Sequence, residues 1–404
     1  MQEKAKEPEI RFAGFTGAWE QRELGEISEI KTGPFGSSLH ASDYVADGVP
    51  IITTEHFKFG SIEKNKYLIP MVSDTDHSRL IAYSLKTGDI VFSRVGSVDI
   101  NALVEPESDG WLFSGRVLRV RSSEKYDSGF LHNLLETDDV RNDIRNRAVG
   151  QTMPSINTQI LSATELTIPS SKREQQRIGN FFKGINQLLT LHQRKYEKLL
   201  NIKKSMLEKM FPKEGEVVPE IRFKGFTGAW EQRKLGAIVQ ITMGQSPDGS
   251  TYSDTPADYI LVQGNADLKN GWVCPRVWTT QKTKFATAGD LIMSVRAPAG
   301  SVGKTAYDVV LGRGVASLKG NEFIYQSLVK MDFDGYWKAE STGSTFESLS
   351  SDSISTAELY CPSEDEQHKI GIFLSRLDSL LTLHQRKLEM LKNVKQAFLE
   401  KMFV

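Results

Sequence analysis

Residues 188–195 read Leu-Leu-Thr-Leu-His-Gln-Arg-Lys, and residues 380–387 repeat the same eight amino acids. The repeat extends further, because Leu207–Phe211 and Leu399–Phe403 both read Leu-Glu-Lys-Met-Phe. Around these motifs the apolar residues alternate at spacings of 4 and 3, which is the period of a coiled-coil seam. The pattern therefore predicts two long helices, from Glu174 to Met210 and from Glu366 to Met402.

The predicted seam would be costly to expose, so we expect the two helices to pack on each other. A second globular body must follow the first helix along the chain. The second helix then has to run back, which predicts an antiparallel pair with a pseudo-two-fold axis near its middle. We interpret the histidines near that axis as polar residues that set the register. The predicted seam consists of Ile178, Phe182, Ile185, Leu189, His192, Leu377, Leu381, His384 and Leu388.

The composition is that of an ordinary soluble globular protein. The 404 residues are 25% charged and 39% hydrophobic, with a net charge of −1, and this length predicts two or three domains. Only Cys274 and Cys361 occur, which argues against a disulfide scaffold or a zinc site. We find no apolar run of about 18 residues and no signal-peptide core near Met1, so we expect no membrane contact and a cytoplasmic location.

The charge is unevenly spread. Residues 172–213 hold 11 basic and 3 acidic side chains, whereas the segments on either side are mildly acidic. One interpretation is a solvated helix face. The other is that the first helix lies along a phosphate backbone.

A second repeat opens each half. Pro8–Ile27 returns nearly unchanged as Pro219–Ile238, and its Trp19 and Trp230 are predicted to be core residues. Later landmarks also recur: a Gly-Asp turn into a buried strand, a helix over 130–147 and 323–340, and a short strand before each long helix. The connecting loops differ, and loops on a shared scaffold are where recognition varies.

These observations predict an α+β fold, in which two similar globular bodies are separated by two long antiparallel coiled-coil helices. The expected division is residues 1–171 for the first body, 172–211 for the first helix, 212–219 for a linker, 220–363 for the second body and 364–404 for the second helix.

One segment suggests an enzyme. Ala297–Thr305 ends in Gly-Lys-Thr like a phosphate-binding loop, but Pro298 stands where that loop needs glycine. Proline offers no backbone N–H to phosphate, so we expect a turn between strands. We find no catalytic signature and no metal-ligand cluster in the sequence, and therefore expect no catalytic or metal site. A scattered nuclease site remains an open alternative.

Polar side chains beside the recurring landmarks have the chemistry of DNA-binding groups. Arginine, glutamine, asparagine, serine and threonine can reach base edges and phosphates, and here they occur in both halves just before the long helix. The candidates are Ser93, Arg94, Gln151, Thr152, Ser155 and Asn157 in the first half and Arg296, Ser344, Thr345 and Ser348 in the second.

The whole layout resembles the specificity (S) subunit of Type I restriction–modification systems. The resemblance rests on Phe15–Arg22 and Phe226–Arg233, on Thr152–Asn157, and on the Glu-Gln motifs at Arg173–Ile178 and Asp365–Ile370, together with the paired long helices. It covers nearly all of the chain.

The resemblance implies that each body is a target recognition domain that reads one half of a split double-stranded DNA sequence. The helix pair would set the spacer between the half-sites and dock two methylation subunits. Those partners would carry S-adenosylmethionine, restriction subunits would supply ATP- and Mg2+-dependent cleavage, and this chain would be non-catalytic. A different class of function, a coiled-coil protein-interaction scaffold without DNA readout, remains the alternative.

Overall fold

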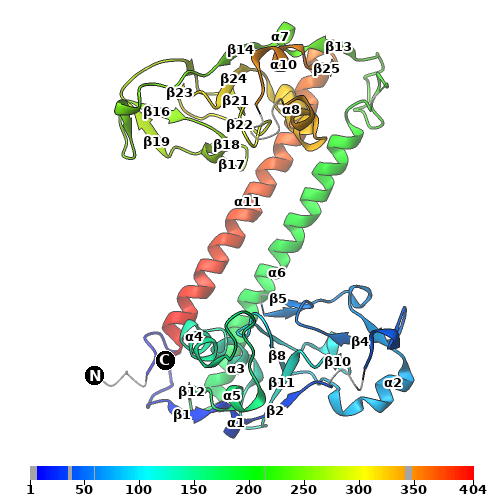
Figure 1. Ribbon diagram of the computed structural model, residues 1–404, viewed down its shortest axis with the longest axis vertical. Coiled ribbons are helices and arrows are strands. Elements are labelled where there is room, and N and C mark those ends of the chain that lie inside the picture. The colour runs from blue at the N-terminus through cyan, green and yellow to red at the C-terminus, as the bar shows by residue number, and fades with distance from the viewer. Residues whose placement is uncertain (1–6, 35–38, 59, 214, 342–347) are drawn as a thin grey trace. The chain divides into compact units, whose positions relative to one another are not determined.

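The computed structural model describes residues 7–34, 39–58, 60–213, 215–341 and 348–404 (Figure 1). The chain forms two compact units. Unit 1 contains residues 1–191 and 388–404, and unit 2 contains residues 192–387, so each unit holds part of both long helices. The domain bounds expected from the sequence instead assign each long helix to a segment of its own. Among the described helices, none has the length and apolar character needed to cross a membrane.

Unit 1 is built on an antiparallel sheet in the order β2-β11-β8-β9, with smaller sheets around it. The strands of the central sheet are β2 (Ser28–Thr32), β11 (Val117–Ser122), β8 (Ile90–Ser93) and β9 (Asn101–Leu103). The other sheets are β10-β4-β7-β3, with β10 (Leu112–Phe113), β4 (Val49–Ile52), β7 (Met71–Val72) and β3 (Tyr44–Val45); β1-β12, with β1 (Glu20–Glu23) and β12 (Glu165–Ile168); and β5-β6, with β5 (Phe57–Lys58) and β6 (Ser61–Ile62).

The helices of unit 1 include two where the sequence predicted one over residues 130–147. The first, α3 (Ser128–Leu134), ends at Leu134, and the second, α4 (Asp138–Arg147), begins at Asp138. Between them the Thr137 hydroxyl donates a hydrogen bond to the Leu134 carbonyl at 2.8 Å. The single-helix prediction is therefore wrong. It is wrong again over residues 323–340, where α8 (Glu322–Phe333) and α9 (Tyr336–Glu340) are separate helices. The helices are α1 (Leu24–Ile27), α2 (Asp74–Arg79), α3 (Ser128–Leu134), α4 (Asp138–Arg147), α5 (Thr158–Ser162) and the first part of α6 (Lys172–Lys209), with 3-10 turns at Ala41–Asp43, Lys66–Leu68, Ile81–Tyr83 and Pro106–Ser108.

Unit 2 repeats the central sheet and extends it by the strands β18 and β17. Its order is β14-β24-β21-β22-β18-β17, beside a five-stranded sheet β15-β19-β16-β23-β20 and the pair β13-β25. The strands are β13 (Glu231–Lys234), β14 (Gln240–Met243), β15 (Tyr252–Ser253), β16 (Tyr259–Val262), β17 (Leu268–Lys269), β18 (Trp272–Val273), β19 (Val277–Thr279), β20 (Phe285–Ala286), β21 (Leu291–Ser294), β22 (Val302–Lys304), β23 (Val309–Leu311), β24 (Val315–Lys319) and β25 (Glu358–Cys361). The helices are α7 (Leu235–Ile238), α8 (Glu322–Phe333), α9 (Tyr336–Glu340), α10 (Ser351–Thr356) and α11 (Glu364–Met402), with 3-10 turns at Gly249–Thr251 and Asn265–Asp267.

The predicted landmarks occupy equivalent places in the two units. The strands after the Gly-Asp turns, β8 and β21, are buried along their whole length. The strands before the long helices pair with the repeated openings in the same register, Glu20 opposite Ile168 and Glu231 opposite Cys361. The stretch Ala297–Thr305 forms the connection from β21 to β22 together with β22 itself, which confirms a turn between strands.

A buried ion pair ties each opening to the long helix that follows its body. The Arg11 Nε lies 2.7 Å from Glu174 Oε1, and the Arg222 Nε lies 2.6 Å from Glu366 Oε1. Each guanidinium makes a second bond to the same carboxylate, the bidentate geometry that arginine favours. Both glutamates stand in the first turn of their helix, where the helix dipole stabilises negative charge.

The long helices α6 and α11 run antiparallel where they meet inside each unit (Figure 1). In unit 1 the Phe181 ring, near the start of α6, lies 4.9 Å from the Phe398 ring near the end of α11. In unit 2 the order is reversed, because Lys203 near the end of α6 contacts Asp378 near the start of α11. The antiparallel arrangement predicted from the repeat is therefore confirmed.

The final phenylalanine of each repeated Leu-Glu-Lys-Met-Phe motif completes the core of the unit that it enters. In unit 1, Phe403 lies 5.7 Å from Phe182 and 5.4 Å from Phe130, between ring centroids. In unit 2, Phe211 stacks on Phe323 at 5.5 Å. Trp19 and Trp230 are 2% and 3% exposed in these same cores, as predicted.

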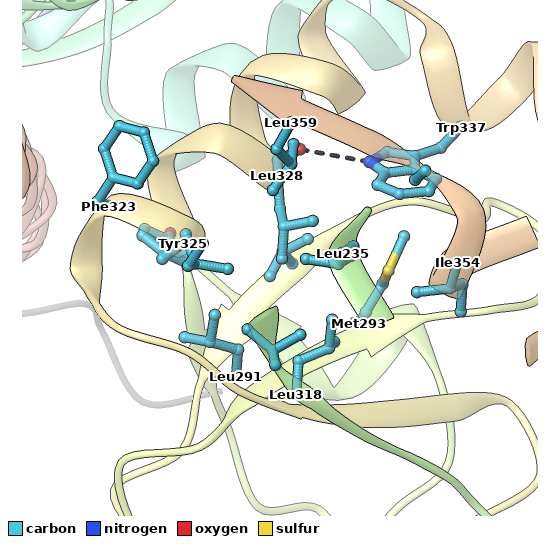
Figure 2. Packing of buried hydrophobic residues seen from close by; sticks show 14 of the residues in the cluster. Leu235, Leu291, Met293, Leu318, Phe323, Tyr325, Leu328, Trp337, Ile354 and Leu359 are labelled. Carbon is cyan, nitrogen blue, oxygen red and sulfur yellow. Dashed lines mark hydrogen bonds between the residues drawn. The ribbon is translucent and has the colours of Figure 1, made fainter. Parts of the chain in front are cut away.

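Figure 2 shows part of the buried core of unit 2, including Phe323. Leucines of β21 and β24 pack against Leu328 of α8, and the Trp337 Nε1 donates a hydrogen bond to the Leu328 carbonyl at 3.3 Å. A buried indole N–H therefore keeps a partner while its ring fills the core.

We predict that Phe403→Ala or Phe211→Ala lowers the free energy of unfolding by about 3–5 kcal/mol, because truncation leaves a cavity beside other aromatic rings. Urea denaturation of the purified chain measures this. Leu383→Ala is the matched control, since that side chain is 45% exposed and should cost within about 0.5 kcal/mol. Equal midpoints for Phe403→Ala and Leu383→Ala would contradict the prediction.

Candidate nucleic-acid interface

Three loops gather at one end of the central sheet of unit 1. They follow β2, precede β11 and follow β8, and antiparallel pairing brings these three strand termini to the same edge. The Gly33 N–H donates to the Val117 carbonyl at 3.2 Å, and the Arg94 N–H donates to the Arg116 carbonyl at 3.0 Å. A Cβ on Gly33 would lie 2.2 Å from the Ser114 carbonyl oxygen, so this close approach requires glycine.

A fourth segment, residues 149–157, joins these loops through backbone contacts. The Ile156 N–H donates to the Arg94 carbonyl at 2.9 Å, and Val95 forms a bridge with Ser155. We call this assembly the strand-end surface of unit 1. The structure thus brings together two groups of predicted residues, those after β8 and those after Gly150, that are far apart in the sequence.

Unit 2 forms the same assembly at the ends of β14, β24 and β21. The Gly244 N–H donates to the Val315 carbonyl at 2.9 Å, and Arg296 forms a bridge with Ser348. Both bridged side chains are exposed. The predicted Ser344 and Thr345 lie outside the described residues. The strand-end surface is therefore a duplicated scaffold.

Two of the predicted residues make contacts within the loops. Ser93 is 2% exposed, and its hydroxyl donates a hydrogen bond to the Val95 carbonyl at 3.3 Å. The side chain therefore stabilises the loop from inside and does not lie on its surface. Its equivalent in unit 2, Ser294, is used in the same way. Arg94 is half-buried and donates to the Gly115 carbonyl at 3.1 Å, which holds two loops together. By strand register, the equivalent of Arg296 is Val95 rather than Arg94.

The remaining candidates divide by exposure. Gln151 and Thr152 are exposed, whereas Ser155 is half-buried and donates to the Val149 carbonyl at 3.3 Å. Asn157 is exposed, but its side-chain oxygen accepts from the Ile160 N–H at 2.8 Å and caps α5. Among the predicted residues of unit 1, Gln151 and Thr152 are therefore the exposed ones for which no role in a cap or loop contact is seen.

Two exposed arginines on the strand-end surfaces were not among the residues predicted from the sequence. Arg116 stands directly before β11, and Arg313 stands two residues before β24. Each follows a glycine just ahead of a buried strand that begins with valine. The Gly-Arg pair recurs one residue out of strand register, because Arg116 aligns with Gly314, and it could have been found as a short motif ahead of the two strands.

The sequence matches a family model twice. The family is described as the Type I restriction modification DNA specificity domain, and the matches span residues 17–201 and 228–393. The chain belongs to this family. The resemblance that the sequence motifs indicated is therefore confirmed at the family level.

Individual relatives of the specificity-domain chain agree with this assignment. It is 26% identical to the putative type I restriction enzyme MjaX specificity subunit of Methanocaldococcus jannaschii, over 94% of this chain and 91% of that protein. The type I restriction enzyme MjaVIII specificity subunit of the same organism is 24% identical over 47% of this chain and 44% of its own length.

Solved structures show the same fold. The crystal structure of the Type I restriction-modification S subunit from M. genitalium has a TM-score of 0.72 at 15% identity, covering 98% of this chain and 99% of that one. A chain from a study of complex assembly and conformational transition of the type I R-M system has a TM-score of 0.51 at 22% identity, covering 95% and 97%.

The predicted seam residues are buried or half-buried, but three of them pack in the core of unit 1 as well as against α11. Ile178, Phe182 and Ile185 are buried, but in the shared core with Trp19 rather than against α11 alone. Leu377, Leu381 and Leu388 are 8–9% exposed, and Leu189 is half-buried. The first turns of each long helix therefore contribute to a body as well as to the helix pair.

The two seam histidines contact each other. The His192 Nδ1 lies 2.8 Å from the His384 Nδ1, so one neutral ring donates its N–H to the other. Burial lowers the pKa of His384, and the nearby charges of His192, Lys195 and Lys387 lower it further. The folded chain therefore favours the neutral form of His384. Among the described residues, no cluster of three or more histidine, cysteine, aspartate or glutamate side chains could hold a metal ion.

A groove of about 1300 Å3 lies in unit 2 beside the repeated opening. Its walls come from residues 222–239, from the start of α8 and from the first turns of α11.

Both long helices also expose leucines of the repeated Leu-Leu-Thr-Leu motif. Leu188 and Leu191 are 47% and 46% exposed, and their equivalents Leu380 and Leu383 are 42% and 45% exposed. These surfaces belong to the repeated part of the chain rather than to its variable loops.

We predict that the helix pair loses stability as the pH falls. The pKa of His384 is lowered in the folded chain, whereas in the unfolded chain it has its ordinary value of about 6.5. Below that pH, the unfolded chain therefore binds a proton at His384 more readily than the folded chain does. The effect of His384 on the free energy of unfolding is absent above that pH, and it becomes destabilising as the pH falls towards the folded pKa. Denaturation midpoints between about pH 7.5 and about pH 5.5 measure the loss.

His384→Asn should reduce that loss, because the titrating group is gone while a polar seam residue remains. The exposed His368→Asn on the same helix is the control and should keep the wild-type pH dependence. Identical pH profiles for His384→Asn and the wild type would refute the role given to the histidine pair.

Proposed function

We propose that this chain is the DNA sequence-recognition subunit of a Type I restriction–modification complex, and that each body reads one half of a bipartite double-stranded DNA target. The observation that carries the proposal is the duplicated strand-end surface with different side chains in its two copies. A repeated scaffold with divergent loops is what two different half-sites require.

The side chains on these surfaces have suitable chemistry. Arg116, Gln151 and Thr152 in unit 1, and Arg296 and Arg313 in unit 2, are exposed. Arginine and glutamine can make bidentate contacts with guanine and adenine edges, and all of them can bind phosphate. The surfaces therefore combine groups that position DNA with groups that can read it.

The helix pair sets the spacer between the half-sites in this proposal. α6 has 38 residues and α11 has 39, so each extends roughly 57 Å at about 1.5 Å per residue. Half-sites read by two related bodies are typically about one DNA turn apart, roughly 34 Å. A rod of this length can hold two bodies at such a separation.

Two methylation subunits dock on the repeated parts of the chain. Identical partners need equivalent surfaces, and the exposed leucine pairs Leu188–Leu191 and Leu380–Leu383 are such surfaces. The partners carry S-adenosylmethionine and the methyl transfer, and restriction subunits carry the ATP- and Mg2+-dependent cleavage. The chain itself is then a non-catalytic subunit that works in the cytoplasm, where the host DNA is.

Mapping methylated bases in DNA from cells with and without this chain tests the proposal. We expect one split target to be methylated only when the chain is present. Exchanging the divergent residues 28–163 for those of an unrelated relative should change one half of that target and leave the other half intact. A change in both halves, or in neither, would contradict one body per half-site.

A further inference from the structure

Each long helix carries a half-buried lysine at the same position of the repeat. These are Lys203 in α6 and Lys395 in α11, whose side chains are 12% and 13% exposed. Lys395 contacts Glu136 of the first body directly. Lys203 contacts Asp378 of α11, and Asp378 accepts a hydrogen bond from Gln326 of α8 in the second body. Each lysine is therefore linked to the body that does not directly precede its own helix in the sequence.

In unit 1 the lysine pairs with a carboxylate of the body. The Lys395 Nζ lies 2.5 Å from the Glu136 Oε2, and Glu136 is 5% exposed just after α3. One turn earlier on α3, the His132 Nδ1 lies 2.6 Å from the Asn101 Oδ1. Asn101 begins β9, which pairs with β8 beside the strand-end surface.

In unit 2 a longer chain of contacts reaches the equivalent strand. The Lys203 Nζ lies 2.5 Å from the Asp378 Oδ1, and Gln326 donates from its Nε2 to the Asp378 Oδ2 at 2.7 Å and to the Glu322 Oε1 at 3.0 Å. Glu322 pairs with Lys304 at 2.9 Å. Lys304 ends β22, which pairs with β21, and β21 leads into the strand-end surface.

The acid differs between the two units while the lysine is kept. The position equivalent to Asp378 in α6 is Asn186, and the position equivalent to Glu136 in α8 is Val329. The carboxylate therefore comes from the other long helix in unit 2 and from the body in unit 1. Both half-buried lysines pair with a carboxylate. The feature that the two units share is therefore the cation from the long helix, not the source of the acid.

In each body a hairpin lies against the helix that follows the central sheet, which is α3 in unit 1 and α8 in unit 2. Gly60 and Gly271, with φ of 77° and 75°, turn the hairpins β5–β6 and β17–β18. A Cβ on Gly60 would lie 3.1 Å from the His132 Nε2, and a Cβ on Gly271 would lie 2.4 Å from the Tyr325 hydroxyl oxygen. The hairpins therefore lie against α3 and α8. Lys395 pairs with Glu136 just after α3, and Lys203 is linked to α8 through Asp378 and Gln326.

We propose that Lys203 and Lys395 are positioning residues for DNA readout, and that each governs the half-site read by the body it enters. A change in the last helix of the chain then affects the half-site of the first body, and a change in the first long helix affects that of the second body. This inference rests on the proposed function, and it makes the two lysines separable in one assay.

The test uses the complete chain assembled with its methylation subunits. Methylation rates are measured on the cognate duplex and on duplexes with one substitution in either half-site. Lys395→Met should reduce discrimination at the first body's half-site by roughly tenfold, about the effect of one mismatched base pair, and leave the other half-site unchanged. Lys203→Met should do the reverse.

Rescue separates positioning from general destabilisation. Lys395→Arg keeps the charge and should retain discrimination, and the exchanged pair Lys203→Asp with Asp378→Lys should restore it at the second half-site. Lys198→Met is the matched control, because Lys198 is exposed and methionine already stands at its equivalent, Met390. It should change neither ratio.

The outcomes distinguish this inference from the proposed function. Absence of chain-dependent methylation by the wild-type complex overturns the proposed function itself. If the wild type discriminates normally, but Lys395→Met alters both half-sites equally or neither, the positioning role is overturned alone. If Lys203→Met fails to fold, the exchanged pair decides: restored discrimination supports the role, and lost discrimination refutes it. If Lys395→Met fails to fold, Glu136→Gln decides, because it removes the charge paired with Lys395: reduced discrimination at the first half-site supports the role, and unchanged discrimination refutes it.

Discussion

The structure depends on the burial of one phenylalanine in each unit by a helix that arrives from the other half of the sequence. Phe403 closes the core around Trp19, and Phe211 closes the core around Trp230. Burying a large aromatic side chain contributes about 2–3 kcal/mol, so neither core is complete without the antiparallel partner helix. The doubled helix is therefore part of both cores as well as the connection between them.

This constraint explains which parts of the chain repeat and which vary. The openings, the Arg–Glu pairs and the long helices must match in shape, because each unit closes on the same elements. The loops at the strand-end surfaces and the outer sheets carry no such constraint, and they differ in length and composition. Specificity can change there without loss of the fold, as expected for a protein of the DNA specificity-domain family.

Periodicity and internal repeats were sufficient to predict the long helices, their antiparallel sense, the buried tryptophans and the strands after the Gly-Asp turns. They failed where a local tertiary contact decides the structure. The break between α3 and α4 has no proline or glycine to mark it. Ser93 and Arg94 were predicted to contact DNA because the sequence does not show which side chains are exposed. The pairing of Lys395 with Glu136, 259 residues away, depends on the fold itself.

The most direct measurement is the spacer of the methylated target after one heptad is inserted into both long helices, before His192 and before His384. Seven residues keep the seam in register and add about 10 Å at about 1.5 Å per residue, which corresponds to roughly 3 base pairs of B-DNA. The account predicts unchanged half-sites separated by a spacer longer by that amount. An unchanged spacer in a folded, active complex would contradict it.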